Sequence, residues 1–548
     1  MHVNVTTTQH PKNKPTWRLF LLLLPFFHGC STLGVRDLPP YQEAKPFEQG
    51  LMSYVRGDLN KSEKVLTQAL QANPTERRTR ELLSAVVREK GTKPSEILKN
   101  PQPPAADPQA PEDLIQVVLS HNPEIRKAMF QVIEGRARLR EANVSISPEF
   151  YLLTRFYPLG FLAGLTQSLY GGYWKREADM AKAEEAMVAA LAEYGRARQD
   201  VLFQTWWAYL DLIEAQEQAR NLRRELKANK EQAGIVGLLN QEGFLMQQSQ
   251  MQAGLKVQAV RQELLKAKKE AAIAQAKLNG LMDRPVQTPL KFSPRYIEAR
   301  LPRPLLQAIL AAYRQRPELA QARAEYERAW HQISATNASI PDIYLRATYG
   351  DSDEAGKGDF IEGFSIGAVL RTPLLFWPLR KAKLDRENAL VRQMALEEDK
   401  LRNLVAVDVV EAHEALSETY TRLDTAQTQI AVAGEGRRIA YLGSENNIGV
   451  DGLTVPTAEI EHLKALREGI DKDYEVQRAT LNVYRASGSP LDQVALTGRR
   501  PLHSASPIQS VLERMDEDPC QLPPEWVSFD PTTTSSRQCA KGKTHAVQ

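Results

Sequence analysis

The clearest covalent chemistry in the chain belongs to a cysteine near its N-terminus. Cys30 follows an apolar run, Leu19–Phe27, which comes after two lysines and an arginine. This pattern predicts an export signal that is too short to anchor the chain in a membrane. We therefore predict a signal peptide over residues 1–29 and lipidation of Cys30. The alternative is an ordinary signal peptide whose core contains a cysteine.

The residues around this cysteine are similar to a bacterial lipobox. Gly29 and Cys30 fit the motif, whereas Phe27 replaces the usual leucine and His28 is atypical. Ser31, and not aspartate, follows the cysteine, which in this class of lipoprotein implies sorting to the outer membrane. Three acyl chains would anchor the mature chain firmly, because each buried methylene contributes about 0.8 kcal/mol.

The two other cysteines, Cys520 and Cys539, lie in a polar tail over residues 491–548 that we expect to be disordered. An oxidising compartment would permit a disulfide between them. Two unpaired thiols are an equally open alternative.

Enzymatic chemistry has little support in the sequence. The nine histidines are scattered, and neither a metal-ligand cluster nor a GxSxG nucleophile motif occurs. Trp206 and Trp207 resemble a binding feature, but an aromatic pair on a coiled helix is usually a packing pair, and we interpret them so. We predict no catalytic site, no metal site and no cofactor, and a formal net charge of only +3 gives no support for a nucleic-acid partner.

The segment over residues 30–99 is similar to a single tetratricopeptide repeat. Small residues at the expected spacing would let two helices approach closely, and a proline would end the second helix. The residues that carry this pattern are Gly50, Tyr54, Gly57, Leu66, Ala69 and Pro74. The functional interpretation is a docking module, and the alternative is a local helical hairpin packed on the main body. A proline-rich spacer follows over residues 100–111.

The rest of the chain contains an internal duplication, 112–300 and 301–490. Pro123 aligns with Pro317 and Pro148 aligns with Pro341, at offsets of 194 and 193 residues. Each copy predicts a short helix, a helix that begins at a proline, a β-hairpin and a pair of long helices. The duplication therefore predicts one architecture built twice.

The long helices are predicted from composition and periodicity. No proline occurs between residues 159 and 284, and most residues there are good helix formers. A seam of apolar residues seven apart, with alanines three residues later, is typical of a coiled coil. Its members are Met180, Met187, Tyr194 and Val201, followed by Ala183, Ala190 and Ala197. Helices of sixty residues would reach about 90 Å, and each pair is predicted to reverse near a glycine, Gly243 or Gly449.

Two β-hairpins, at about 149–170 and 342–372, separate the helices. In the second hairpin apolar and polar residues alternate over nine or ten positions, which is typical of a strand between lipid and a wet lumen. In the first hairpin the alternation is less regular, and Gln167 falls on the apolar face. The alternative is a soluble hairpin packed on a helix. Four strands cannot close a transmembrane barrel, whereas three copies would supply twelve.

This order of features resembles the TolC-like outer-membrane channel family over residues 112–490. The resemblance implies a mostly α fold with a transmembrane β-barrel part. It implies a homotrimer in outer-membrane lipid whose twelve-stranded barrel continues as a periplasmic helical tunnel. It also implies a passive exit duct for efflux or type I secretion, with an adaptor protein and an inner-membrane pump docked at the tips near Gly243 and Gly449. Asp451 is a candidate tip carboxylate, although the aspartate pair usual in this family is missing and an exposed loop carboxylate is the alternative.

A second function class is a lipid-anchored coiled-coil scaffold or adaptor that spans the periplasm without a pore. Such a protein would carry compact β domains beside one helical hairpin. The two hairpins between long helices favour the channel.

Overall fold

The structure is a computed structural model. It describes residues 45–92, 98, 108, 110–144, 149–156, 159–170, 172–290, 292, 295–297, 304–338, 342–353, 360–371, 376–445, 452–494 and 496–497. The helices are α1 (Pro46–Arg56), α2 (Leu59–Ala72), α3 (Arg77–Lys90), α5 (Pro111–His121), α6 (Pro123–Val144), α7 (Gly172–Gln241), α8 (Gln247–Leu281), α9 (Leu305–Gln315), α10 (Pro317–Ala338), α11 (Phe376–Glu445) and α12 (Thr454–Ala486). The strands are β1 (Glu149–Phe156), β2 (Leu159–Tyr170), β3 (Tyr296–Ile297), β4 (Asp342–Asp353), β5 (Phe360–Arg371) and β6 (Leu496–Thr497).

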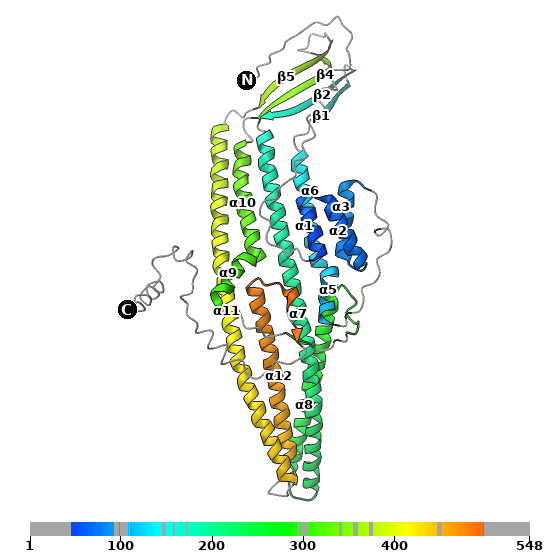
Figure 1. Cartoon of the computed structure of the whole chain (residues 1–548), viewed down its shortest axis with the longest axis vertical. Helices are drawn as coiled ribbons and strands as arrows, with labels where there is room; N and C mark the ends of the chain where they lie inside the picture. The colour runs from blue at the N-terminus through cyan, green and yellow to red at the C-terminus, as the bar shows by residue number, and fades with distance from the viewer. Residues whose placement is uncertain are drawn as a thin grey trace, which may run out of the picture.

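The molecule is a long column of helices with a β-sheet at one end (Figure 1). Helices α7 and α11 have 70 residues each, which corresponds to about 105 Å. They exceed the predicted sixty residues because each continues without interruption through the middle of the molecule. None of the described helices combines the length and the apolar composition that a membrane-spanning helix requires.

The helices pack in a different order on the two sides of the middle. On the sheet side, α7 contacts α6 and α10, and α10 contacts α11. On the tip side, α7 contacts α8 and α12, and α12 contacts α11. The four tip-side helices therefore form a row, α8–α7–α12–α11, whose two ends are α8 and α11 (Figure 1).

The predicted coiled-coil seam lies in the main core from Ala183 to Val201, whereas Met180 is partly buried and does not belong to that core. Met187, Tyr194 and Val201 are fully buried, and the alanines of the seam are half-buried against the same core. Trp206 is buried as well, and its indole N–H donates a hydrogen bond of 2.8 Å to the carbonyl oxygen of Leu491. The interpretation of Trp206 as a packing residue is therefore confirmed.

The first three helices share this core with α5, α6 and α7. Gly50 of α1 lies directly against Leu66 of α2, because a Cβ atom at Gly50 would come within 2.4 Å of Leu66 Cδ2. The Ser62 hydroxyl donates a hydrogen bond of 2.8 Å to the Gly50 carbonyl oxygen. Two of the residues of the tetratricopeptide-like pattern thus bring α1 and α2 into close contact.

Charged residues attach helices α1–α3 to the middle of the column. Arg126 and Arg136 of α6 pair with glutamates of α3 at 2.5 and 2.8 Å. Lys45, just before α1, pairs with Asp492 at 2.5 Å, and Asp492 also pairs with Arg198 of α7 at 2.8 Å. The N-terminal helices are therefore tied both to α7 and to the short turn that follows α12.

Candidate functional site: a two-faced sheet, a helical column and its tip

The sheet at the end of the column has the strand order β1-β2-β4-β5, and every neighbouring pair is antiparallel. The two predicted hairpins therefore join edge to edge within one chain, through β2 and β4. The register between β2 and β4 shifts between Ser168 and Tyr170. This irregularity follows directly after Gln167, in the part of the sequence where the alternation is weakest.

The register separates the residues of the sheet into two faces. Paired residues on neighbouring antiparallel strands share a face, and successive residues alternate between faces. One register row contains Glu149, Thr166, Arg346 and Gly367, and the next row of that face contains Tyr151, Gly164, Thr348 and Ser365. This face is rich in polar residues and glycine.

The central rows of the opposite face are apolar, whereas Asp351 and Glu362 pair on this face near the end of β4. One central row contains Phe150, Leu165, Ala347 and Ile366, and another contains Leu152, Ala163, Tyr349 and Phe364. Gln167 pairs with Leu345 and is a polar exception on this face. Such a sheet can separate an apolar medium from water.

Strands β1 and β5 form the two edges of this sheet. Within the described residues, each is paired on one side only. A strand edge carries unpaired N–H and C=O groups that need hydrogen-bond partners. The edges are therefore open for pairing with another chain.

The opposite end of the column contains the first of the two predicted tip turns. Gly243 has φ +78° and ends α7, and the Phe244 N–H donates to the Leu239 carbonyl oxygen at 2.8 Å. This is a glycine helix cap, in which only glycine adopts a left-handed conformation without steric cost. Phe244 and Met246 beside it are each 77% exposed. The tip therefore presents apolar side chains to its surroundings.

Several predicted site residues lie outside the described residues. They are Cys30, Gly449, Asp451, Cys520 and Cys539. Among the residues that the structure describes, no group of three or more His, Cys, Asp or Glu could hold a metal ion.

Buried ion pairs join α12 to α7 and α8 in the tip half. Arg467 of α12 lies 3.5 Å from Glu225 of α7, whose side chain is fully buried, and also pairs with Glu263 of α8. About three helical turns further along α12, Arg478 pairs with Asp211 at 2.8 Å and with Glu214. Burial raises the pKa of Glu214 to about 7, against the opposing effect of Arg478. No pattern in the sequence indicates these pairs, since their members lie more than 200 residues apart.

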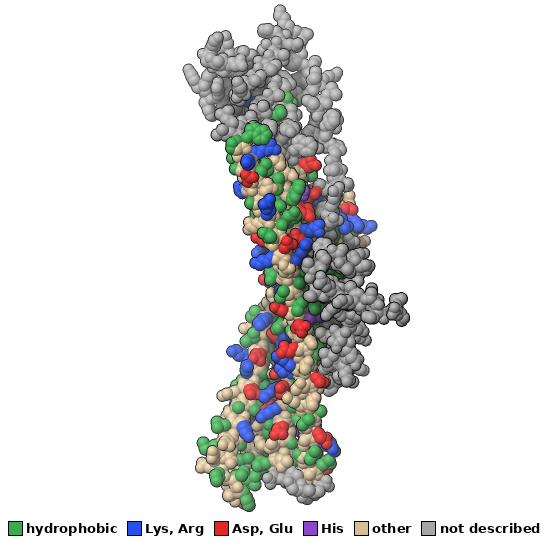
Figure 2. All heavy atoms as spheres, turned by 90° about the vertical axis from the view of Figure 1, so that its left-hand side faces the viewer, with side chains coloured by type: hydrophobic (Ala, Val, Ile, Leu, Met, Phe, Trp, Pro, Cys, Tyr) green, Lys and Arg blue, Asp and Glu red, His purple; other side chains and the backbone are tan. Residues whose placement is uncertain are grey.

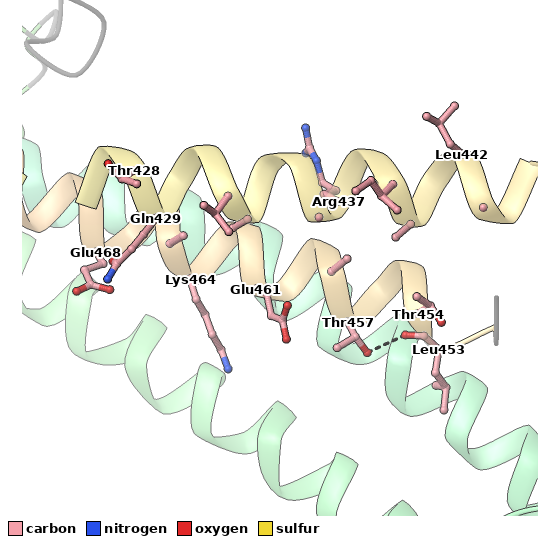
Figure 3. Close-up of a pocket in the computed structure, with 18 residues that line it drawn as sticks. Thr428, Gln429, Arg437, Leu442, Leu453, Thr454, Thr457, Glu461, Lys464 and Glu468 are labelled. Carbon is pink, nitrogen blue, oxygen red and sulfur yellow. Dashed lines mark hydrogen bonds between the residues drawn. The ribbon is translucent and has the colours of Figure 1, made fainter. Parts of the chain in front are cut away.

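An open groove of about 1340 Å³ runs between α11 and α12 near the tip. Its α11 side contains small residues at coiled-coil spacing, Ala433, Gly436, Ala440 and Gly443. Its α12 side carries Glu461, Lys464 and Glu468, which project together from the helix (Figure 3). No pattern in the sequence indicates this groove, because small residues at this spacing are also typical of closely packed helices.

The comparisons with known proteins give the same architecture. No protein-family model and no curated protein matches the sequence. Solved structures do match: the outer membrane protein VceC from Vibrio cholerae is 17% identical over 70% of this chain and 96% of its own, with a TM-score of 0.57. The MtrE outer membrane channel from Neisseria gonorrhoeae is 18% identical over 70% and 89%, with a TM-score of 0.56. The Campylobacter jejuni CmeC outer membrane channel is 15% identical over 74% and 89%, with a TM-score of 0.58.

These likenesses cover 96% of VceC and 89% of MtrE and of CmeC. They leave about 30% of this chain unmatched in VceC. The chain therefore has the fold of the TolC-like outer-membrane channels, as its sequence predicted.

Proposed function

We propose that the protein is the outer-membrane channel subunit of a tripartite efflux or type I secretion system. It provides a passive exit duct across the periplasm and the outer membrane. The observation that carries this proposal is the two-faced sheet at one end of a helical column about 105 Å long. The apolar face suits lipid, the polar face suits a wet lumen, and the column is long enough to extend through a periplasmic space.

The open edges of the sheet support a homotrimer. In lipid, unpaired backbone groups on β1 and β5 would have no hydrogen-bond partners, so a spanning sheet must close. Three copies supply twelve strands, which exceeds the eight strands of small transmembrane barrels. In this assembly β5 of one protomer pairs with β1 of the next, with the polar rows facing the lumen.

The tip is the proposed docking point for a periplasmic adaptor and an inner-membrane pump. Gly243 and Gly449 mark the two turns, and the exposed Phe244 and Met246 give the first turn an apolar surface. Asp451 is a proposed tip carboxylate. The pump supplies the energy, so this chain needs no catalytic residue of its own.

We further propose that acyl chains on Cys30 anchor the protomer in the outer membrane. Lys45 is held at the level of Arg198 through Asp492, about 26 residues along α7 from the sheet, or about 39 Å. An extended chain from Cys30 to Lys45 spans at most about 50 Å. The anchor can therefore reach the membrane beside the barrel. We also propose a disulfide between Cys520 and Cys539 in the C-terminal tail.

A charge scan of one strand tests the membrane barrel. Ala347 and Thr348 are neighbours on β4, in an apolar and a polar register row respectively. Ala347→Arg should abolish the heat-modifiable trimer in outer-membrane extracts, because arginine facing lipid at mid-depth costs about 2 to 4 kcal/mol. Thr348→Arg should retain that trimer.

The wild-type protein should also resist carbonate and require detergent for extraction. Release of the wild-type protein by carbonate, or equal tolerance of the two arginines, would instead favour the peripheral scaffold. The fold gives that alternative no support, because both hairpins lie between long helices.

A further inference from the structure

We infer that residues 507–518 of the C-terminal tail dock on helix α9 of the same chain as a short amphipathic helix. This tail segment lies outside the described residues. Its docking surface is an apolar stripe on α9, formed by Leu306, Leu310 and Tyr313. The inference goes beyond the proposed channel and does not depend on it.

The stripe lies on a side of α9 that the rest of the column leaves uncovered. In the described part of the chain, α9 packs mainly on α11, where Ala308 and Ala312 are buried (Figure 1). The stripe residues are four and three positions apart, so they share another face of the helix. Leu306 and Tyr313 are 43% and 38% exposed there, and Leu310 is partly exposed. Figure 2 shows hydrophobic side chains at the surface along this side of the column.

The internal duplication shows that this stripe is specific to the second copy. At the offset of 194 residues, its three positions correspond to Glu112, Gln116 and Leu119 of α5. Glu112 and Gln116 are exposed and polar, whereas Leu119 is buried in the core that α5 shares with α1–α3. The second copy therefore has leucines at two positions that face water in the first. Single exposed apolar residues are ordinary, but a continuous stripe of them indicates a partner.

One stretch of the tail has the sequence of a partner for this stripe. Ser506 is a favourable N-cap, Pro507 suits the first helical position, and Pro519 would end the helix. The helix expected between them has nearly the length of α9, which has 11 residues. Its apolar residues follow the spacing i, i+3, i+4, i+7, which is typical of a helix with one apolar face. They are Ile508, Val511, Leu512 and Met515.

The charges of the two segments are complementary. Residues 507–518 contain four acidic residues and one arginine. Helix α9 contains no acidic residue, its Arg314 is exposed, and Arg303 lies just before it in the sequence. Complementary charges favour the correct partner more than they add affinity. A net acidic helix is therefore suited to α9.

The connection is long enough for the tail segment to reach α9. Gly488, just after α12, touches the end of α9, because a Cβ atom at Gly488 would lie 3.1 Å from the backbone nitrogen of Arg316. Nine residues later, Thr497 pairs with Tyr296 in the strand that precedes α9. Thr497 therefore lies within about 30 Å of α9, and the ten residues from Thr497 to Pro507 span up to about 33 Å.

Disulfide crosslinking in native membranes tests this contact. The full-length chain with Cys520→Ser and Cys539→Ser receives Leu310→Cys, at the middle of the stripe, together with Leu512→Cys. Mild oxidation should join the two thiols, and mass spectrometry of non-reduced peptides measures the yield. The control pairs Leu310→Cys with Ser510→Cys, which lies about 200° around the expected helix from Leu512. Both tail thiols have almost the same tether, so a docked helix should give at least tenfold less control product.

The crosslinking outcomes each decide the inference. Equal yields in the two pairs would mean that the tail only passes near α9, and would overturn it. Covalent dimers on a denaturing gel would assign the stripe to the tail of another copy and would also overturn docking within the chain. Trimeric protein that shows no crosslink overturns this inference and leaves the proposed channel standing. The expected crosslink in protein that never forms trimers supports this inference, whereas the proposed channel then fails.

Amide hydrogen exchange provides a second test without cysteines. In the full-length protein, amides of residues 508–515 should exchange at least tenfold more slowly than those of residues 530–545. Leu306→Glu with Leu310→Glu should remove this protection, because the acidic side chains repel the tail segment and break the apolar stripe. Gln307→Glu, at an exposed position of the same helix, should retain it. Protection that survives the double substitution would show that the segment packs elsewhere, and would overturn the inference.

Discussion

Arg78 holds the N-terminal helices on the column, and its removal should release them. The side chain is 4% exposed, and its guanidinium donates to the Tyr194 hydroxyl at 2.8 Å and stacks 3.6 Å from the Phe47 ring. It also lies 3.6 Å from the carboxylate of Glu48, which is 2% exposed. Arg78→Ala removes the nearer of the two arginines beside this buried carboxylate and leaves Arg198 at 3.8 Å. Breaking a buried pair in this way costs about 3 to 5 kcal/mol.

The neighbouring Arg77 is the matched control. Its side chain is 40% exposed and its ion pairs, at 3.4 and 3.5 Å, lie at the surface. Arg77→Ala should therefore cost at most about 1 kcal/mol. Because 1.4 kcal/mol is a factor of ten, amide hydrogen exchange in α1–α3 should accelerate by about one hundred-fold or more in Arg78→Ala. In Arg77→Ala it should accelerate by less than about tenfold.

Neutralising the Glu48 carboxylate tests the cause. Glu48→Gln in the Arg78→Ala background should recover part of the lost protection, since a neutral amide is cheaper to bury than a charge. The reasoning fails if the two arginine variants exchange at the same rate. It fails also if Arg78→Ala with Glu48→Gln exchanges faster than Arg78→Ala alone.

Three further predictions concern the column and the N-terminal helices. Trp206→Phe should lower the free energy of unfolding by about 1 to 3 kcal/mol, because the buried Leu491 carbonyl loses its hydrogen-bond donor. Trp207→Phe should cost less, because the Trp207 indole N–H makes no hydrogen bond in the structure, and equal melting temperatures of the two variants in calorimetry would count against this account. Gly50→Ala should destabilise α1–α3 by about 1 to 3 kcal/mol, because the added Cβ would overlap with Leu66. Gly254→Ala should stabilise α8 by about 0.5 to 1 kcal/mol, because the space around its Cβ position is open. Thermal melts that rank the two variants in the opposite order would refute the packing argument. Burial raises the pKa of Glu214 to about 7, above its ordinary 4.5, so the folded protein binds this proton more tightly than the unfolded chain does. Its stability should therefore rise as pH falls from about 7 toward 4.5. In thermal melts at several pH values Glu214→Gln should lack this increase, and an unchanged pH dependence would contradict the burial of Glu214.

The sequence predicted the features that depend on local pattern. Proline positions located the starts of α6 and α10, and the seven-residue spacing of Met187, Tyr194 and Val201 located the buried seam of α7. Alternation located the two faces of β4 and β5, and Gly243 located the first tip turn. Each of these signals arises from the backbone geometry of one element and needs no knowledge of its neighbours.

The sequence did not predict the features that depend on which surfaces meet. Periodicity indicates that one face of α12 is buried, but it does not indicate that Arg467 reaches Glu225 on a helix more than 200 residues earlier. In the same way, the small residues at Gly436 and Ala440 gave no sign that α11 leaves a groove beside α12. The attachment of α1–α3 through Asp492 depends on a contact between the two ends of the described chain. Such contacts are set by the packing of whole helices.

Electron cryomicroscopy of the full-length protein in lipid nanodiscs tests the central claim most directly. The account predicts three copies that share one closed barrel of twelve strands within the lipid, with β5 of each protomer hydrogen-bonded to β1 of the next. A single copy, or a sheet of four strands whose edges face water outside the bilayer, would contradict it.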